Sequence, residues 1–147
     1  MRSYANVTER TTDWHSIDWR KANRLVRGLR RRIFKATSEG NWRKVRSLQK
    51  LMLRSYSNTL VSVRKATQDN RGRKTAGVDK VLVKTPQARG TMVDDLINNQ
   101  SWKPKPVKRV YIPKTNGKKR PLGIPTIKDR CLQAIVKNAR QSPIASA

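Results

Sequence analysis

The sequence VKRVYIPKTNGKKRPLGI, residues 107–124, separates this chain from an all-helical protein. Asn116-Gly117 is the strongest short signal for a hairpin turn, and the residues before it alternate between the two sides of an extended strand. The prolines in and beside both runs forbid a helix and suit an edge ribbon better than the centre of a sheet. The pattern predicts a β-hairpin over residues 102–126 and therefore an α+β fold.

Helices are predicted on both sides of this hairpin. Downstream, an apolar line that includes Cys131 indicates a final helix over about residues 126–139. Upstream, Thr85-Pro86 is a typical helix start, because a capping hydroxyl precedes a proline at the first helical position. Residues 69–74 are rich in turn formers and cations, and they predict a loop between two lobes.

Two longer amphipathic helices are predicted over residues 16–39 and 41–68. Apolar residues recur every three or four positions in both, and Gly40 ends the first helix. Asp13 or Ser16 is expected to cap its start. Because a glycine turn joins the two helices, they are expected to pack as an antiparallel hairpin.

The four tryptophans fall into two groups. Trp19 and Trp42 lie on the apolar helical lines and are expected in the core. Trp14 and Trp102 lie at element edges and are candidates for stacking on nucleobases. Cys131 lies on the apolar face of the last helix and is expected to be a small core residue.

The charge of the chain favours a polyanionic partner. Its 147 residues include 35 Lys and Arg against 9 Asp and Glu, for a formal net charge of +26. Residues 1–73 carry +14 and residues 74–147 carry +12, which excludes a basic tail on a neutral domain. Nucleic acid is the default polyanion. No membrane partner is expected, because no apolar run approaches the ~20 residues that span a bilayer.

The densest cationic segment, Lys103 to Arg120, contains eight basic residues and no acid. Alternate side chains of a strand share a face, so several of these cations converge on a hairpin. A solvated edge strand protected by lysines is the alternative, but the absence of acids favours contact with phosphate. Arginine stripes on the long helices favour bidentate phosphate contact. The RNA-binding candidates are Arg20, Arg24, Arg27, Arg31, Arg43, Arg46, Arg54, Lys108, Arg109, Lys118 and Lys119.

No catalytic residue and no metal site is expected in this chain. Nucleotidyl transferases and nucleases need paired or tripled carboxylates to hold two metal ions. The one adjacent acidic pair, Asp94-Asp95, lies in a predicted helix, where successive side chains point about 100° apart. One carboxylate is therefore expected to face solvent and the other to pair with a nearby cation.

A series of motifs runs from Trp14 to about Asn138. It comprises Trp14-x-x-Ile17-Asp18-Trp19, Val26…Leu29…Arg32-Ile33, Val45…Leu48-Gln49…Leu51, Ser62-Val63-Arg64-Lys65, Thr75-Ala76-Gly77-Val78-Asp79, RVYIPK at 109–114 and KRPLGIPTIKDR at 119–130. Together these motifs resemble the N-terminal region of group II intron-encoded reverse transcriptase/maturases. The last two look like the first conserved reverse transcriptase block, at the base of the fingers, and are the most specific.

The resemblance implies a role for each part of the chain. In this family the N-terminal helices grip intron RNA and template, and the fingers hairpin closes over the incoming nucleotide. By position in the motif, Lys114 and Arg120 match the residues that touch the triphosphate, and Arg130 matches a residue close to the template. The implied division is a leader at 1–13, a helical N-terminal extension at 14–70, a partial fingers region at 71–139 and a divergent tail at 140–147.

The sequence departs from the family pattern where the palm would follow. It contains no Tyr-Ala-Asp-Asp-type turn, and Asp94-Asp95 precedes the fingers hairpin. The chain is therefore expected to be an RNA-binding fragment, truncated before the palm, without polymerase activity of its own. It is expected to need no cofactor; magnesium is expected only in a full-length enzyme. Intron RNA and template-primer are the expected partners, in a bacterial cytoplasm or an organellar matrix.

Two other functions remain open. Composition alone permits a standalone basic RNA-binding accessory protein, such as a splicing or ribosome-associated cofactor. The chain could also be a split subunit that a separately encoded palm completes into an active enzyme.

Overall fold

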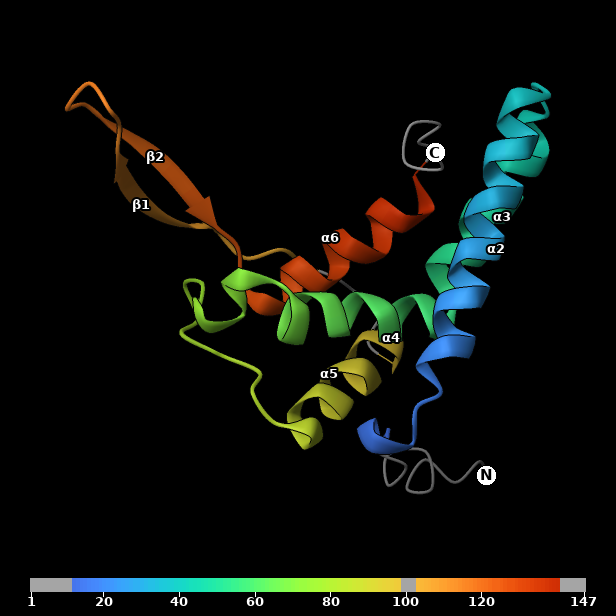
Figure 1. Ribbon diagram of the computed structural model, residues 1–147, viewed down its shortest axis with the longest axis horizontal. Helices are drawn as coiled ribbons and strands as arrows, with labels where there is room; N and C mark the ends of the chain where they lie inside the picture. The colour runs from blue at the N-terminus through green and yellow to red at the C-terminus, as the bar shows by residue number, and fades with distance from the viewer. Residues whose placement is uncertain (1–11, 99–102, 141–147) are drawn as a thin grey trace.

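The computed structural model describes residues 12–98 and 103–140, and it confirms the α+β fold. A body of helices carries two arms that diverge from it (Figure 1). One arm is the helix pair α2–α3, and the other is the two-stranded antiparallel hairpin β1–β2. The bounds of these elements are α2 Trp19–Ser38, α3 Trp42–Arg54, β1 Lys108–Pro113 and β2 Lys119–Ile124.

The α2–α3 arm forms the antiparallel helical hairpin expected from its periodicity. The predicted cap at Asp13 or Ser16 is wrong, because Asp13 caps a separate 3-10 turn, η1 (Trp14–Ser16). Helix α2 is capped by Asp18, whose side chain accepts a hydrogen bond from the backbone N of Lys21 at 3.0 Å. Gly40 adopts φ +68, a left-handed conformation that glycine takes at little cost, and the chain reverses there.

The single helix predicted over residues 41–68 is wrong, because the chain breaks it at Ser55. This residue is extended, and its side-chain oxygen accepts a hydrogen bond from the backbone N of Asn58 at 3.2 Å. A serine that caps a new helix competes with continuation of the old one. The break lets α4 (Tyr56–Arg64) turn into the body, where it continues as a π-helical turn, η2 (Lys65–Asp69).

Helices α5 (Pro86–Asn98) and α6 (Ile127–Ala139) complete the body and begin where predicted. The hydroxyl of Thr85 accepts a hydrogen bond from the backbone N of Ala88 at 3.1 Å. The hydroxyl of Thr126 does the same for the backbone N of Asp129, also at 3.1 Å. Between α4 and α5 the chain passes through a 3-10 turn, η3 (Arg71–Lys74).

The glycine in the middle of α5 has a packing reason. A Cβ at Gly90 would collide with the backbone carbonyl of Thr12. Asp94 holds Thr12 in this position, since its carboxylate accepts hydrogen bonds from the backbone N at 3.0 Å and the hydroxyl at 2.6 Å. Thr12 therefore lies directly against α5.

The buried core consists of two clusters. One joins η1 and the body helices and includes Leu60, Val63 and Val93. The other lies between α2 and α3, reaches the end of α6, and includes Ile33 and the fully buried Met52. In the part of the chain that the structure describes, no helix combines the length and apolarity needed to cross a bilayer.

Two of the tryptophan predictions are wrong. Trp14, a candidate for base stacking, is buried against Trp19, with ring centroids 4.8 Å apart. Trp42, expected in the core, is 51% exposed, because it lies in the first turn of α3 beside the reversal of the arm. Trp19 is half-buried against the core, beneath the guanidinium of Arg64 at 4.6 Å. Trp102 lies outside the described residues.

Candidate nucleic-acid interface

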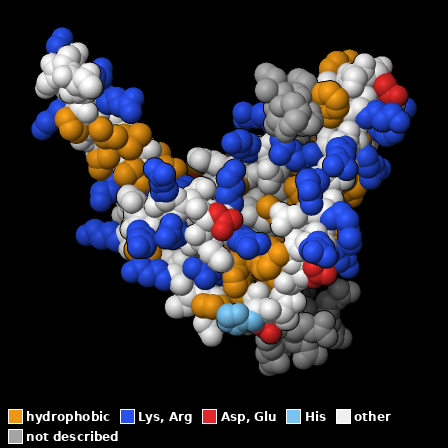
Figure 2. All heavy atoms as spheres, viewed as in Figure 1, with side chains coloured by type: hydrophobic (Ala, Val, Ile, Leu, Met, Phe, Trp, Pro, Cys, Tyr) orange, Lys and Arg blue, Asp and Glu red, His pale blue; other side chains and the backbone are white. Residues whose placement is uncertain are grey.

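The two helices of the α2–α3 arm present basic side chains without an acid, and Glu39 lies in the turn between them. Helix α2 contains eight Lys and Arg residues, α3 contains five, and neither contains Asp or Glu. Figure 2 shows these cations spread along the arm. Because no carboxylate on either helix neutralises them, their charge is available to a polyanion. The predicted RNA-binding residues of the arm are all exposed: Arg20, Arg24, Arg27, Arg31, Arg43, Arg46 and Arg54.

The β-hairpin places Lys114 and Arg120 on one face at its turn end. Ile112 pairs with Arg120, and the backbone N of Lys114 donates to the carbonyl O of Lys118 at 2.6 Å. Side chains alternate between the faces of a strand, so Lys114, two residues beyond Ile112, shares the face of Arg120. A lysine and an arginine thus project in the same direction from adjacent strands.

The turn of the hairpin is made by Asn116-Gly117, within a three-residue loop. The backbone N of Gly117 donates to the carbonyl O of Lys114 at 3.1 Å, and Gly117 has φ +81. The side-chain oxygen of Asn116 accepts from the backbone N of Lys118 at 3.1 Å. A glycine in the left-handed conformation is typical of three-residue hairpin loops.

The hairpin is open to solvent on both faces. By the register, one face carries Lys108 and Lys118 beside the Lys114–Arg120 pair, and the other carries Arg109 and Lys119. All of these cations are exposed. Tyr111 at 60% and Leu122 at 41% are exposed among them, and Figure 2 shows apolar side chains between the cations along this arm. The ribbon therefore combines charge with apolar contact surface.

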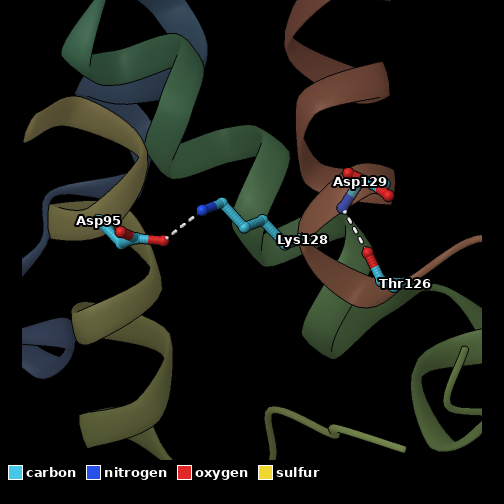
Figure 3. A network of polar contacts seen from close by, with 4 residues as sticks. All are labelled: Asp95, Thr126, Lys128 and Asp129. Carbon is cyan, nitrogen blue, oxygen red and sulfur yellow. Dashed lines mark hydrogen bonds and ion pairs between the residues drawn. The ribbon is translucent and has the colours of Figure 1, made fainter. Parts of the chain in front are cut away.

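The segment Thr126–Arg130, at the start of α6, ties the hairpin to the body. Figure 3 shows two of the contacts of this segment, the Thr126–Asp129 cap and the ion pair between Lys128 and Asp95. A carboxylate oxygen of Asp129 accepts a hydrogen bond from the backbone N of Lys105, at the root of the hairpin, at 3.0 Å. Lys128 forms an ion pair with Asp95 of α5 at 2.8 Å. The motif most specific to the family resemblance is thus also the junction between α5, α6 and the hairpin.

Arg130, matched by resemblance to a residue close to the template, is engaged with the backbone. Its Nε donates to the carbonyl O of Pro125 at 3.0 Å, Nη1 to that of Gly72 at 2.8 Å and Nη2 to that of Thr75 at 2.5 Å. Burial lowers its pKa below the ordinary value, but an arginine stays charged at neutral pH. Its contacts hold the loop after η3 against α6, and its template role stays a prediction.

The acidic pair Asp94-Asp95 is divided between two structural partners. Asp94 binds Thr12, and Asp95 binds Lys128, so the predicted cation partner exists whereas Asp94 does not simply face solvent. Within residues 12–98 and 103–140, no three His, Cys, Asp or Glu side chains gather where they could share a metal ion.

Cys131 is fully buried on α6, as predicted. Burial raises the pKa of its thiol to about 12. The thiol is therefore neutral at physiological pH, and thiolate chemistry is disfavoured there.

Sequence reasoning missed Arg32, because it adjoins the buried Ile33. The structure brings Arg32 together with Arg24 of α2 and Arg54 of α3 around one groove of the arm. The signal that could have found it is the spacing of Arg24, Gly28 and Arg32, which places all three on one face of a helix.

Comparison with known proteins identifies the family. Residues 14–96 match the N-terminal domain of reverse transcriptase. Protein YkfC of Escherichia coli (strain K12) is 40% identical over 88 residues, which cover 56% of this chain and 23% of that protein. Maturase-like protein 1 of Euglena gracilis is 30% identical over 122 residues, which cover 82% of this chain and 27% of that protein.

The matched region extends from η1 to α5 in the family comparison, and the match to the Euglena protein covers most of the chain. This chain spans about a quarter of the length of these curated relatives. It belongs to the family of reverse transcriptase N-terminal domains, as its resemblance to the N-terminal region of group II intron reverse transcriptase/maturases predicted.

Proposed function

We propose that this chain is an RNA-binding N-terminal region of a group II intron reverse transcriptase/maturase. The observation that carries the proposal is the pair of arms in which basic side chains greatly outnumber acidic ones. Helices α2 and α3 hold thirteen cations, and the hairpin from β1 to β2 holds six more. Neither these two helices nor the hairpin contains a carboxylate, and Glu39 lies in the turn between α2 and α3. A surface of this kind matches the phosphate backbone, which dominates nucleic-acid affinity.

The two arms have different roles in this proposal. Arginines along the helical arm contact intron RNA or template, because guanidinium groups bind phosphate bidentately. Lys114 and Arg120, side by side at the turn end of the hairpin, contact the incoming triphosphate when a palm is present. The helical N-terminal extension is then residues 14–70, and the partial fingers region is residues 71–139.

The same proposal assigns no catalysis to this chain alone. Polymerases position two metal ions with carboxylates, and the adjacent pair Asp94-Asp95 is occupied by Thr12 and Lys128. Primer extension with magnesium and nucleotides is expected to yield no product from the purified chain. Extension that starts only after a separately made palm polypeptide is added would support a split enzyme instead.

The RNA-binding proposal is tested by the salt dependence of affinity. Filter binding to a structured RNA is measured between 50 and 200 mM salt. On a duplex, each neutralised phosphate contributes about −0.9 to the slope of log affinity against log salt, so six to ten contacts reduce affinity about 10³- to 10⁵-fold over this range. A flat response would contradict binding through the arms.

A further inference from the structure

The α2–α3 arm contains an apolar groove with a basic rim. It has a volume of ≈ 450 Å³, within the range of about 300–1,000 Å³ typical of small-ligand sites. Leu25, Leu29 and Leu51 contribute its apolar lining, together with the backbone surface at Gly28. The remaining lining residues are Arg24, Arg32, Arg54 and Ser55.

The groove is open because of a glycine in the middle of a helix. A Cβ added at Gly28 would meet no atom within 4 Å, so packing within the arm does not require a glycine there. Leu25 is 47% exposed and Leu51 is 52% exposed, although their neighbours Val26 and Met52 are buried. Apolar surface that the fold leaves uncovered in this way is typical of a binding site.

The charges around the groove decide what kind of ligand fits it. Three of its eight lining residues are arginines, and none is acidic. An apolar peptide would gain nothing from this rim, whereas a nucleotide has a flat, weakly hydrated base and an anionic phosphate on each side. Unpaired RNA bases are commonly bound between apolar or guanidinium surfaces, with arginines on the flanking phosphates.

We infer that this groove binds an unpaired nucleobase of RNA, with Arg24, Arg32 and Arg54 on the flanking phosphates. The inference rests on the proposed RNA-binding function and adds a preference for single-stranded or bulged positions. A duplex keeps its bases stacked, so it contacts only the arginines.

The test compares two RNA hairpins that differ by one base. The first carries a single bulged adenosine, and the second carries an abasic nucleotide at the same position, so that both offer the same phosphates. The wild-type chain is expected to bind the adenosine bulge about tenfold more tightly, near the lower end of the effect of stacking one base. Equal binding of the two RNAs would contradict the inference that the groove binds a base. Absence of binding to either RNA would also contradict the proposed RNA-binding function.

Gly28→Leu is the decisive variant, because its side chain would fill the groove from within. It should bind both hairpins equally, at the affinity of the wild type for the abasic RNA, and should keep its salt slope. Its unfolding temperature should equal or exceed that of the wild type, since leucine is the better helix former. Gly28→Ala controls for helix propensity and should retain most of the preference.

A second variant, Leu25→Ala/Leu51→Ala, removes the apolar lining instead of filling the groove. It too should lose the preference for a base, and both side chains are exposed enough for the fold to tolerate the change. Retained preference in either variant would contradict the inference. A change of oligomeric state in Gly28→Leu by sedimentation, with the base preference intact, would assign the groove to a second copy of the chain instead.

Discussion

The two basic arms are built in opposite ways. The α2–α3 arm buries an apolar line along its length, including Ile33 and Met52, and joins the body through α4 and α6. The β-hairpin packs chiefly on itself and leaves Tyr111 and Leu122 exposed on opposite faces. The helical arm is therefore part of the folding unit, whereas the hairpin is attached to it mainly at its root.

This difference between the arms predicts which substitutions alter the stability of the chain and which alter its affinity for RNA. Cations on the helical arm lie on a rigid surface of fixed spacing, which suits an extended RNA backbone. Cations on the hairpin lie on a ribbon that is joined to the body at its root, where the carboxylate of Asp129 accepts a hydrogen bond from the backbone N of Lys105. We expect substitutions to act on RNA affinity, on unfolding or on local order, according to the arm or junction that they touch.

The largest effect is expected from exposed arginines of the helical arm. Replacing Arg27, Arg31, Arg46 and Arg54 together with Ala should lower RNA affinity up to about 10³-fold at 0.1 M salt, because each lost phosphate contact removes about 0.9 from the salt slope. The hairpin double variant, Lys114→Ala/Arg120→Ala, should cost less than about tenfold. Filter binding with the same RNA measures both. An equal or larger loss from the hairpin pair would place the main RNA contact there.

A core residue of the helical arm should control stability. Met52 is fully buried between α2 and α3, and Met52→Ala should lower the free energy of unfolding by about 3 kcal/mol through lost burial and an unfilled cavity. Leu53→Ala on the same helix, 45% exposed, is the matched control and should cost under about 1 kcal/mol.

Leu122→Ala extends this comparison to the hairpin. Because Leu122 is 41% exposed, the substitution should leave global unfolding nearly unchanged. Denaturant titration measures the free energy of unfolding of Met52→Ala, Leu53→Ala and Leu122→Ala. A hairpin variant as destabilising as Met52→Ala would show that the hairpin folds cooperatively with the body.

A more local effect is expected at Arg130, which holds the loop after η3 against α6. Arg130→Lys keeps the charge but loses the planar fork that reaches the carbonyls of Gly72, Thr75 and Pro125, so it should destabilise the chain by about 1–3 kcal/mol. Amide exchange should quicken in residues 72–77. The control, Arg109→Lys, lies on the exposed hairpin and should change neither the free energy of unfolding nor the amide exchange of residues 72–77. If amide exchange is unchanged in Arg130→Lys, the close contact of Gly77 with the backbone of Thr126 is sufficient to hold residues 72–77 in place.

Gly77 is the second contact that holds the loop after η3. A Cβ there would lie 2.7 Å from the backbone N of Thr126 and 2.8 Å from its Cα, so only glycine allows this approach. The Thr-Ala-Gly-Val-Asp motif is explained by this contact. Its sequence indicated a family resemblance, but nothing local to it indicated which segment it would meet.

The sequence by itself determined the features that neighbouring residues settle among themselves. These are the helical periods, the caps at Thr85 and Thr126, the reversal at Gly40, the hairpin turn at Gly117 and the excess of positive charge. Each depends on backbone preferences or on hydrogen bonds that span only a few positions. Such short-range interactions can be predicted from the pattern of neighbouring residues.

Only the tertiary structure decided what distant segments do to one another. It buried Trp14 and exposed Trp42, placed α4 in the core of the body, and joined Arg130 to carbonyls 55 and 58 positions away. It also left the groove at Gly28 uncovered. Burial and long-range hydrogen bonds depend on which surfaces meet in space, and the periodicity of one helix carries no information about the partner that covers it.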